Sequence, residues 1–68
     1  MSENRAKILK YFKDRLGKVV TIDEIAADLL LPPDDVYRIV LLLVDQDILK
    51  VVPASIEKKE LELVAAAS

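Results

Sequence analysis

The chain has 68 residues, 53% of them apolar, carries a formal net charge of −2, and contains neither Cys nor His. Without these two residue types it can form no disulfide and none of the usual zinc sites, so packing of helices and strands must hold a core that is marginal at this size. The lack of His, and of any hydroxyl with a base beside it, also argues against an enzyme; we expect no catalytic residue, cofactor or metal.

The charge is unevenly distributed. Residues 1–20 hold six basic and two acidic side chains, whereas residues 21–49 hold one basic and seven acidic side chains. The longest uncharged apolar run, Ile39 to Val44, is six residues long and far too short to span a bilayer. We therefore expect no membrane span and no membrane partner, and the absence of Cys favours a cytoplasmic protein. A small domain has little interior for so many apolar residues, which favours a partner chain or a dimer.

The first predicted helix covers about residues 3–16. Apolar residues recur in it at three- and four-residue spacing, which is typical of a helix with one buried face. These residues are Ile8, Leu9, Phe12 and Leu16. Gly17 follows directly and favours the left-handed conformation that often ends a helix. The β-branched pair Val19-Val20 then predicts a very short strand.

Two further helices are predicted at about residues 22–30 and 33–46. Thr21 and Glu24 have the spacing of a capping box, in which each side chain bonds the backbone N–H of the other residue. Pro32 interrupts the pattern, and Pro33 suits the first turn of the next helix. The buried stripe expected for the first of these helices is Ile22, Ile25, Ala26 and Leu29.

The periodicity changes after Asp47. Residues 48–53 and 60–65 read as two strands of a hairpin, and the second alternates between acidic and apolar residues. Residues 53–59 are expected to form the loop between them. The sequence thus predicts one domain, residues 1–68, of the α+β class and mostly helical.

This order of elements resembles that of the winged helix-turn-helix family. In such proteins a small residue in the second helix is followed by a turn residue, usually glycine, and then by a β-branched core residue. Ala26, Leu30 and Val36 stand at these positions, so Leu30 replaces the usual glycine. The resemblance implies a three-helix core with a two-stranded wing, and it implies that residues 33–46 form the helix that enters a DNA groove.

The outward side of that helix does not have the composition of a DNA reader. At about 100° per residue, the inward side carries Val36, Ile39, Val40 and Leu43, and the outward side carries Asp34, Arg38, Leu41 and Asp45. Leu42 and Val44 lie near this outward side. We expect Asp34 to pair with Arg38 one turn later and partly neutralise it. Acidic side chains repel phosphates, so groove binding is disfavoured.

Two functions remain open. The first is a non-enzymatic interaction module that binds another protein or a second copy of itself, with an interface predicted at Tyr37, Leu41, Leu42, Val44 and Asp45. The second is a small DNA-binding transcriptional regulator with contacts from Arg38, Lys58 and Lys59. A structural alternative to the first is that the hairpin or the tail simply buries Leu41, Leu42 and Val44.

Overall fold

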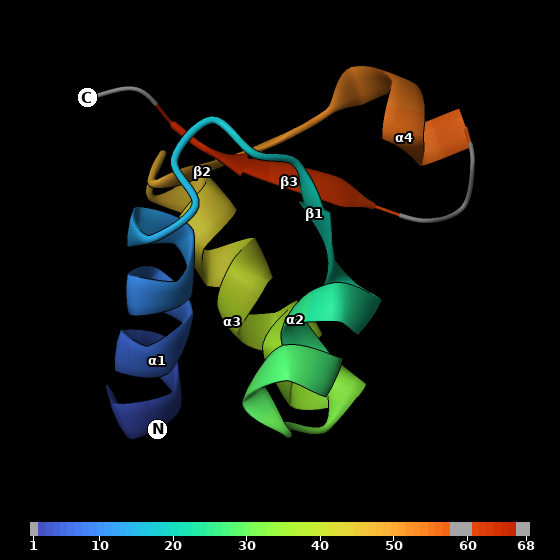
Figure 1. The fold of residues 1–68 in the computed structure, drawn as a ribbon. Coiled ribbons are helices and arrows are strands. Elements are labelled where there is room, and N and C mark those ends of the chain that lie inside the picture. The colour runs from blue at the N-terminus through green and yellow to red at the C-terminus, as the bar shows by residue number, and fades with distance from the viewer. Residues whose placement is uncertain (1, 58–60, 67–68) are drawn as a thin grey trace.

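The computed structural model describes residues 2–57 and 61–66. As predicted, the fold is α+β and mostly helical. Three longer helices lie on one side of a small antiparallel sheet, and a short fourth helix lies at one end of it (Figure 1). The helices bury their apolar faces against one another and against the sheet, which forms a single core.

Helix α1 spans Ser2–Lys13, so it ends earlier than the predicted limit at residue 16. Turns replace the helix over residues 14–17, and the Arg15 N–H bonds the Phe12 carbonyl at 3.0 Å. The prediction that Leu16 is part of the buried stripe was wrong, because it lies beyond the helix and is 70% exposed. Tyr11 joins Ile8 and Phe12 in the core instead.

Helix α2 spans Ile22–Leu29 and begins with the predicted capping box. Thr21 Oγ1 accepts from the Glu24 N–H at 3.2 Å, and Glu24 Oε1 accepts from the Thr21 N–H at 3.3 Å. Leu30 ends the helix in the left-handed conformation, with φ 55° and ψ 44°. Leu30 is 89% exposed, so this side chain loses no packing by occupying a conformation that usually favours glycine.

Helix α3 spans Pro33–Asp45, and Pro33 lies in its first turn, as predicted. Pro32 is the N-cap. Val36, Val40 and Leu43 are fully buried on its inner side. Ile39 is partly buried against the same core. This row fixes the rotation of α3 about its own axis and therefore decides which of its side chains face outward.

The sheet has three strands in the order β1-β3-β2. The chain forms β1 at Val20–Thr21, β2 at Leu49–Val51 and β3 at Glu62–Ala65. Both outer strands pair antiparallel with β3, β1 through Val20 and Leu63, and β2 through Lys50 and Val64. The two predicted hairpin strands are therefore present but shorter, and β1, displaced by one residue from the predicted Val19-Val20, pairs with β3 and extends the hairpin.

The prediction of a plain loop after β2 was wrong for residues 53–57, which form the short helix α4, Pro53–Glu57. A proline suits a first helical turn because its missing N–H has no partner there in any case. Ser55 is fully buried, and its hydroxyl donates to the Val52 carbonyl at 2.6 Å. The remainder of the predicted loop, residues 58 and 59, lies outside the described residues.

Candidate interaction surface

The outward side of α3 is exposed in the structure. We call its six exposed side chains the outer face: Asp34, Tyr37, Arg38, Leu41, Leu42 and Asp45. Leu41 is 42% exposed, Leu42 is 59% exposed and Tyr37 is 44% exposed. The hairpin therefore does not bury the two leucines, contrary to the structural alternative considered above.

Val44 differs from the other predicted interface residues. It is partly buried and packs against the core, because it lies at the border between the inner side of α3 and the outer face. For Val44 the simpler expectation, burial within the chain, describes the structure better than an interface role.

The charges of the outer face are not paired as expected. Neither the Arg38 nor the Asp34 side chain has a hydrogen bond or an ion pair among the described residues, so the predicted pair between them is absent. Both are exposed, and an exposed pair of this kind gains at most a few tenths of a kcal/mol, which is too little to hold two mobile side chains together. Arg38 is consequently available to a partner.

A shallow groove borders the outer face on the side of α1. It has a volume of about 340 Å³ and is lined by Asn4, Asp35, Arg38, Ile39 and Leu42. Beyond it, Arg5 of α1 donates from Nη2 to Oε1 of Gln46 at 3.0 Å, just past the end of α3. The part played by Asn4 and Arg5 could not be read from the sequence, because it depends on how α1 packs beside α3.

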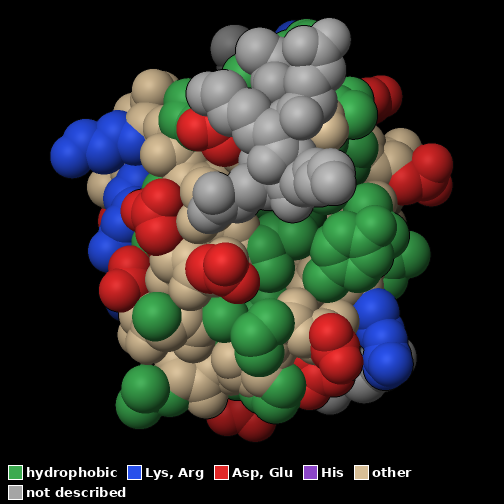
Figure 2. Space-filling model, turned by 90° about the vertical axis from the view of Figure 1, so that its right-hand side faces the viewer, with side chains coloured by type: hydrophobic (Ala, Val, Ile, Leu, Met, Phe, Trp, Pro, Cys, Tyr) green, Lys and Arg blue, Asp and Glu red, His purple; other side chains and the backbone are tan. Residues whose placement is uncertain are grey.

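Exposed apolar side chains also occur on the face that includes α2 and α4. Figure 2 shows hydrophobic side chains gathered across this face, with acidic side chains between them and Lys or Arg toward its edges. Apolar surface interrupted by carboxylates is thus a feature of the molecule that extends beyond α3. Such a surface suits a polypeptide better than it suits a polyanion.

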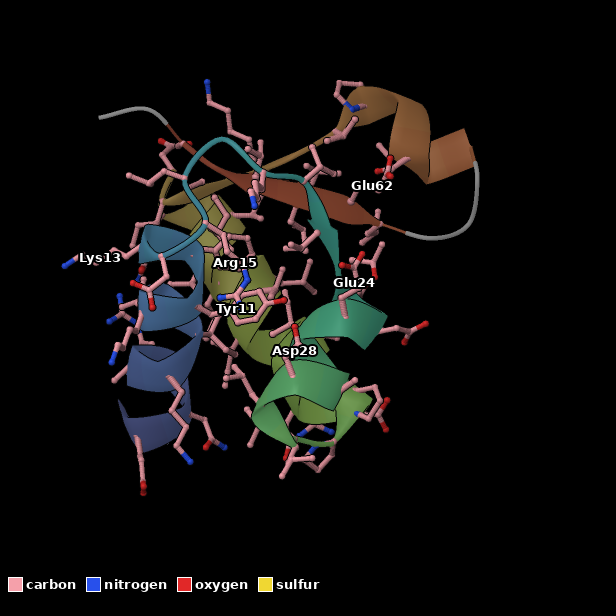
Figure 3. The ribbon with its side chains drawn as sticks, in the orientation of Figure 1. Tyr11, Lys13, Arg15, Glu24, Asp28 and Glu62 are labelled. Atoms are coloured by element: carbon pink, nitrogen blue, oxygen red, sulfur yellow. The ribbon has the colours of Figure 1, made fainter. Side chains whose placement is uncertain are left out.

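A second cluster, which the sequence did not reveal, joins α1 to α2 (Figure 3). The Tyr11 hydroxyl donates to Asp28 Oδ2 at 2.7 Å. The Arg15 guanidinium lies 3.8 Å from the centre of the Tyr11 ring, and its Nη1 donates to the Tyr11 carbonyl at 3.2 Å. The contact between Arg15 and Tyr11 had one signal in the sequence, because the two residues are separated by the spacing of one helical turn.

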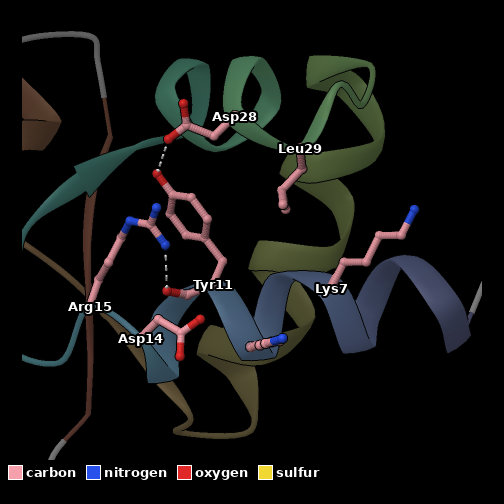
Figure 4. A pocket seen from close by; sticks show the side chains of 7 residues that line it. Lys7, Tyr11, Asp14, Arg15, Asp28 and Leu29 are labelled. Carbon is pink, nitrogen blue, oxygen red and sulfur yellow. Dashed lines mark hydrogen bonds between the residues drawn. The ribbon is translucent and has the colours of Figure 1, made fainter.

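This Tyr11 cluster lines a pocket of about 220 Å³ together with Lys7, Lys10, Asp14 and Leu29 (Figure 4). Burial, followed by the hydrogen bond and the negative charge of Asp28, raises the pKa of Tyr11 to about 12. A hydroxyl with so high a pKa is neutral at physiological pH and is already used as a donor. The cluster is therefore suited to fastening two helices together and not to acid–base chemistry.

The other residues predicted for a DNA contact, Lys58 and Lys59, lie outside the described residues. Among residues 2–57 and 61–66, no set of three or more acidic side chains is arranged to hold a metal ion. Within the same ranges, no helix combines the length and apolar content that a bilayer crossing requires.

The comparisons with known proteins give no further guide to function. No protein-family model, no curated protein and no solved structure matches the chain. Function must therefore be inferred from the outer face and its surroundings.

Proposed function

We propose that the chain is a winged-helix interaction module that uses the outer face of α3 to bind another polypeptide. The order of helices and strands supports the winged-helix part of this proposal, as does the sheet, in which the last two strands pair with each other and with β1. Ala26 and Val36 are buried, and Leu30 has the left-handed backbone that the resemblance expects at a turn glycine.

One observation supports the proposed binding of a polypeptide. Leu41 and Leu42 are exposed on a helix whose other side is already buried in the core. Complete burial of a leucine is worth about 2 kcal/mol, and each of these side chains is roughly half exposed, so covering both with a partner contributes about 2 kcal/mol in total. This gain in free energy favours contact with an apolar protein surface.

The charges around these two leucines also favour a protein partner. Helix α3 contains the acidic residues Asp34, Asp35 and Asp45 and the single basic residue Arg38. Nucleic-acid binding takes most of its strength from cations that neutralise phosphates, so this composition opposes insertion of α3 into a DNA groove. It permits a protein partner that presents apolar groups and a cation beside them.

The test is a binding experiment with the purified chain immobilised and an extract of the cells that produce it. Leu41→Glu should abolish retention of the polypeptide that binds the unmodified chain. Leu16→Glu is the matched control, because Leu16 is also an exposed leucine but lies in the turn after α1. Equal retention by both variants would show that the outer face is not the contact.

Binding to DNA is a second candidate, and one observation favours it. Arg38 is exposed near the middle of the outer face and has no partner among the described residues, so it could reach a phosphate or a guanine. A duplex titration at low salt tests this candidate. Binding that weakens with added salt and is lost on Arg38→Ala would support it, and no binding at about 20 mM salt would eliminate it.

A further inference from the structure

The charged side chains of the outer face are ordered in a way that specifies one partner. We propose that two copies of the chain associate through their α3 helices in antiparallel orientation, with Arg38 of each copy against Asp45 of the other. This inference rests on the proposed function, since it uses the same face, and it names the polypeptide that covers it.

The spacing of charged residues within α3 aligns one cation with one anion. Arg38 and Asp45 are seven residues apart, which is close to two helical turns, so they lie on the same side of the helix about 10 Å apart. Leu41 and Leu42 fall between them along the axis, one on each side of the line that joins the two charges. From Arg38 onward the outer face therefore presents a cation, an apolar pair and an anion, and Asp34 lies one turn before Arg38.

Two-fold symmetry would pair these two charges across the contact. In a two-fold interface the same surface of each copy is used, so that residue i meets residue j and residue j meets residue i. A two-fold axis that passes between Leu41 and Leu42 places Arg38 opposite Asp45 of the second copy, twice. The same axis brings Leu41 onto Leu41 of the second copy along one side of the contact, and Leu42 onto Leu42 along the other.

The alternative, a parallel pair, is disfavoured by the charges. It would place Arg38 against Arg38 and Asp45 against Asp45, and like charges brought together in an interface oppose association. Antiparallel packing converts both repulsive contacts into attractive ones. The order of the charges along α3 thus selects the orientation.

The side chains required for this contact are available. The Arg38 and Asp45 side chains are both exposed, and neither has a hydrogen bond or ion pair among the described residues. No existing contact has to be broken before the two copies meet, and the leucines between them are already exposed. A contact made by one helix from each copy is smaller than a standard interface of about 1,600 Å², so we expect dissociation in the micromolar range.

Sedimentation equilibrium of the purified chain, from about 0.5 to about 500 µM, tests the inference because this range spans dissociation constants from about 1 to about 100 µM. The unmodified chain should show a reversible monomer–dimer equilibrium. Arg38→Asp alone, or Asp45→Arg alone, creates two like-charge contacts per dimer and should weaken association about tenfold or more. The double variant Arg38→Asp with Asp45→Arg restores both attractive pairs and should return to within about threefold of the unmodified chain.

Lys13→Asp is the control for the change in net charge, since Lys13 is an exposed cation at the end of α1; it should leave the dimer unchanged. A chain that stays monomeric at every concentration overturns the inference. So does a dimer that is insensitive to the single reversals, or a double variant as weak as the single variants. If the unmodified chain is monomeric and yet Leu41→Glu loses a different retained polypeptide, the inference fails while the proposed function stands.

Discussion

Replacement of Tyr11 by Phe tests how α1 is fastened to α2. The change deletes only the hydroxyl that donates to Asp28 at 2.7 Å, while the ring keeps its position in the core and the Arg15 guanidinium still lies over it. A hydrogen bond to a charged acceptor contributes about 1.5–3 kcal/mol. Asp28 is exposed, and water solvates it once the hydroxyl is gone, so we expect a loss of about 1 kcal/mol at pH 7.

The pH dependence follows from the Tyr11 pKa, which folding raises from its ordinary value of 10.0 to about 12. The unfolded chain loses this proton first, so between pH 10 and pH 12 the folded state binds more protons and stability falls as pH rises. Two pKa units correspond to at most about 2.7 kcal/mol. Because solvent screens the exposed Asp28 carboxylate, a loss of about 1–2 kcal/mol is expected.

Urea unfolding followed by circular dichroism, at intervals from pH 8 to pH 12, measures both quantities. The comparison isolates this hydroxyl, because the unmodified chain and Tyr11→Phe are otherwise identical. The stability difference between the two proteins should therefore shrink above pH 10. A difference that stays constant or grows up to pH 12 would refute the role assigned to the Tyr11 hydroxyl.

Two other substitutions test the local geometry, and both are measured by urea unfolding. Thr21→Ala removes the acceptor of the Glu24 N–H in the capping box and should cost about 1 kcal/mol; a change below about 0.3 kcal/mol would count against the cap. Leu30→Gly relieves a left-handed backbone at a residue that is 89% exposed. It should leave stability unchanged or raise it by up to about 1 kcal/mol, whereas a clear loss would mean that the Leu30 side chain packs.

Local patterns proved to be the most predictable part of the fold. The capping box at Thr21 and the placement of Pro33 in a first helical turn depend on neighbours within a few residues, so the sequence alone indicated both. The inner side of α3 was also predictable, because helical periodicity places Val36, Val40 and Leu43 on one side whatever they pack against.

Predictions that depended on where an element stops, or on long exposed side chains, were less successful. Leu16 continues the apolar spacing of α1, but the helix ends before it, and Tyr11 occupies the core in its place. The pair between Asp34 and Arg38 satisfied the spacing rule but is absent, because two solvated side chains gain too little from meeting. The groove beside α3 could not be predicted, since Asn4 reaches it only through the packing of α1.

The most direct measurement of the central claim is photo-crosslinking from the outer face. A benzoylphenylalanine introduced at Leu41 should form covalent adducts with a polypeptide, either a second copy or another protein. The same group introduced at Leu16, which is even more exposed, should form far fewer. Equal yields from the two positions, or adducts of Leu41 with nucleic acid alone, would contradict the assignment of the outer face of α3 as a protein-binding surface.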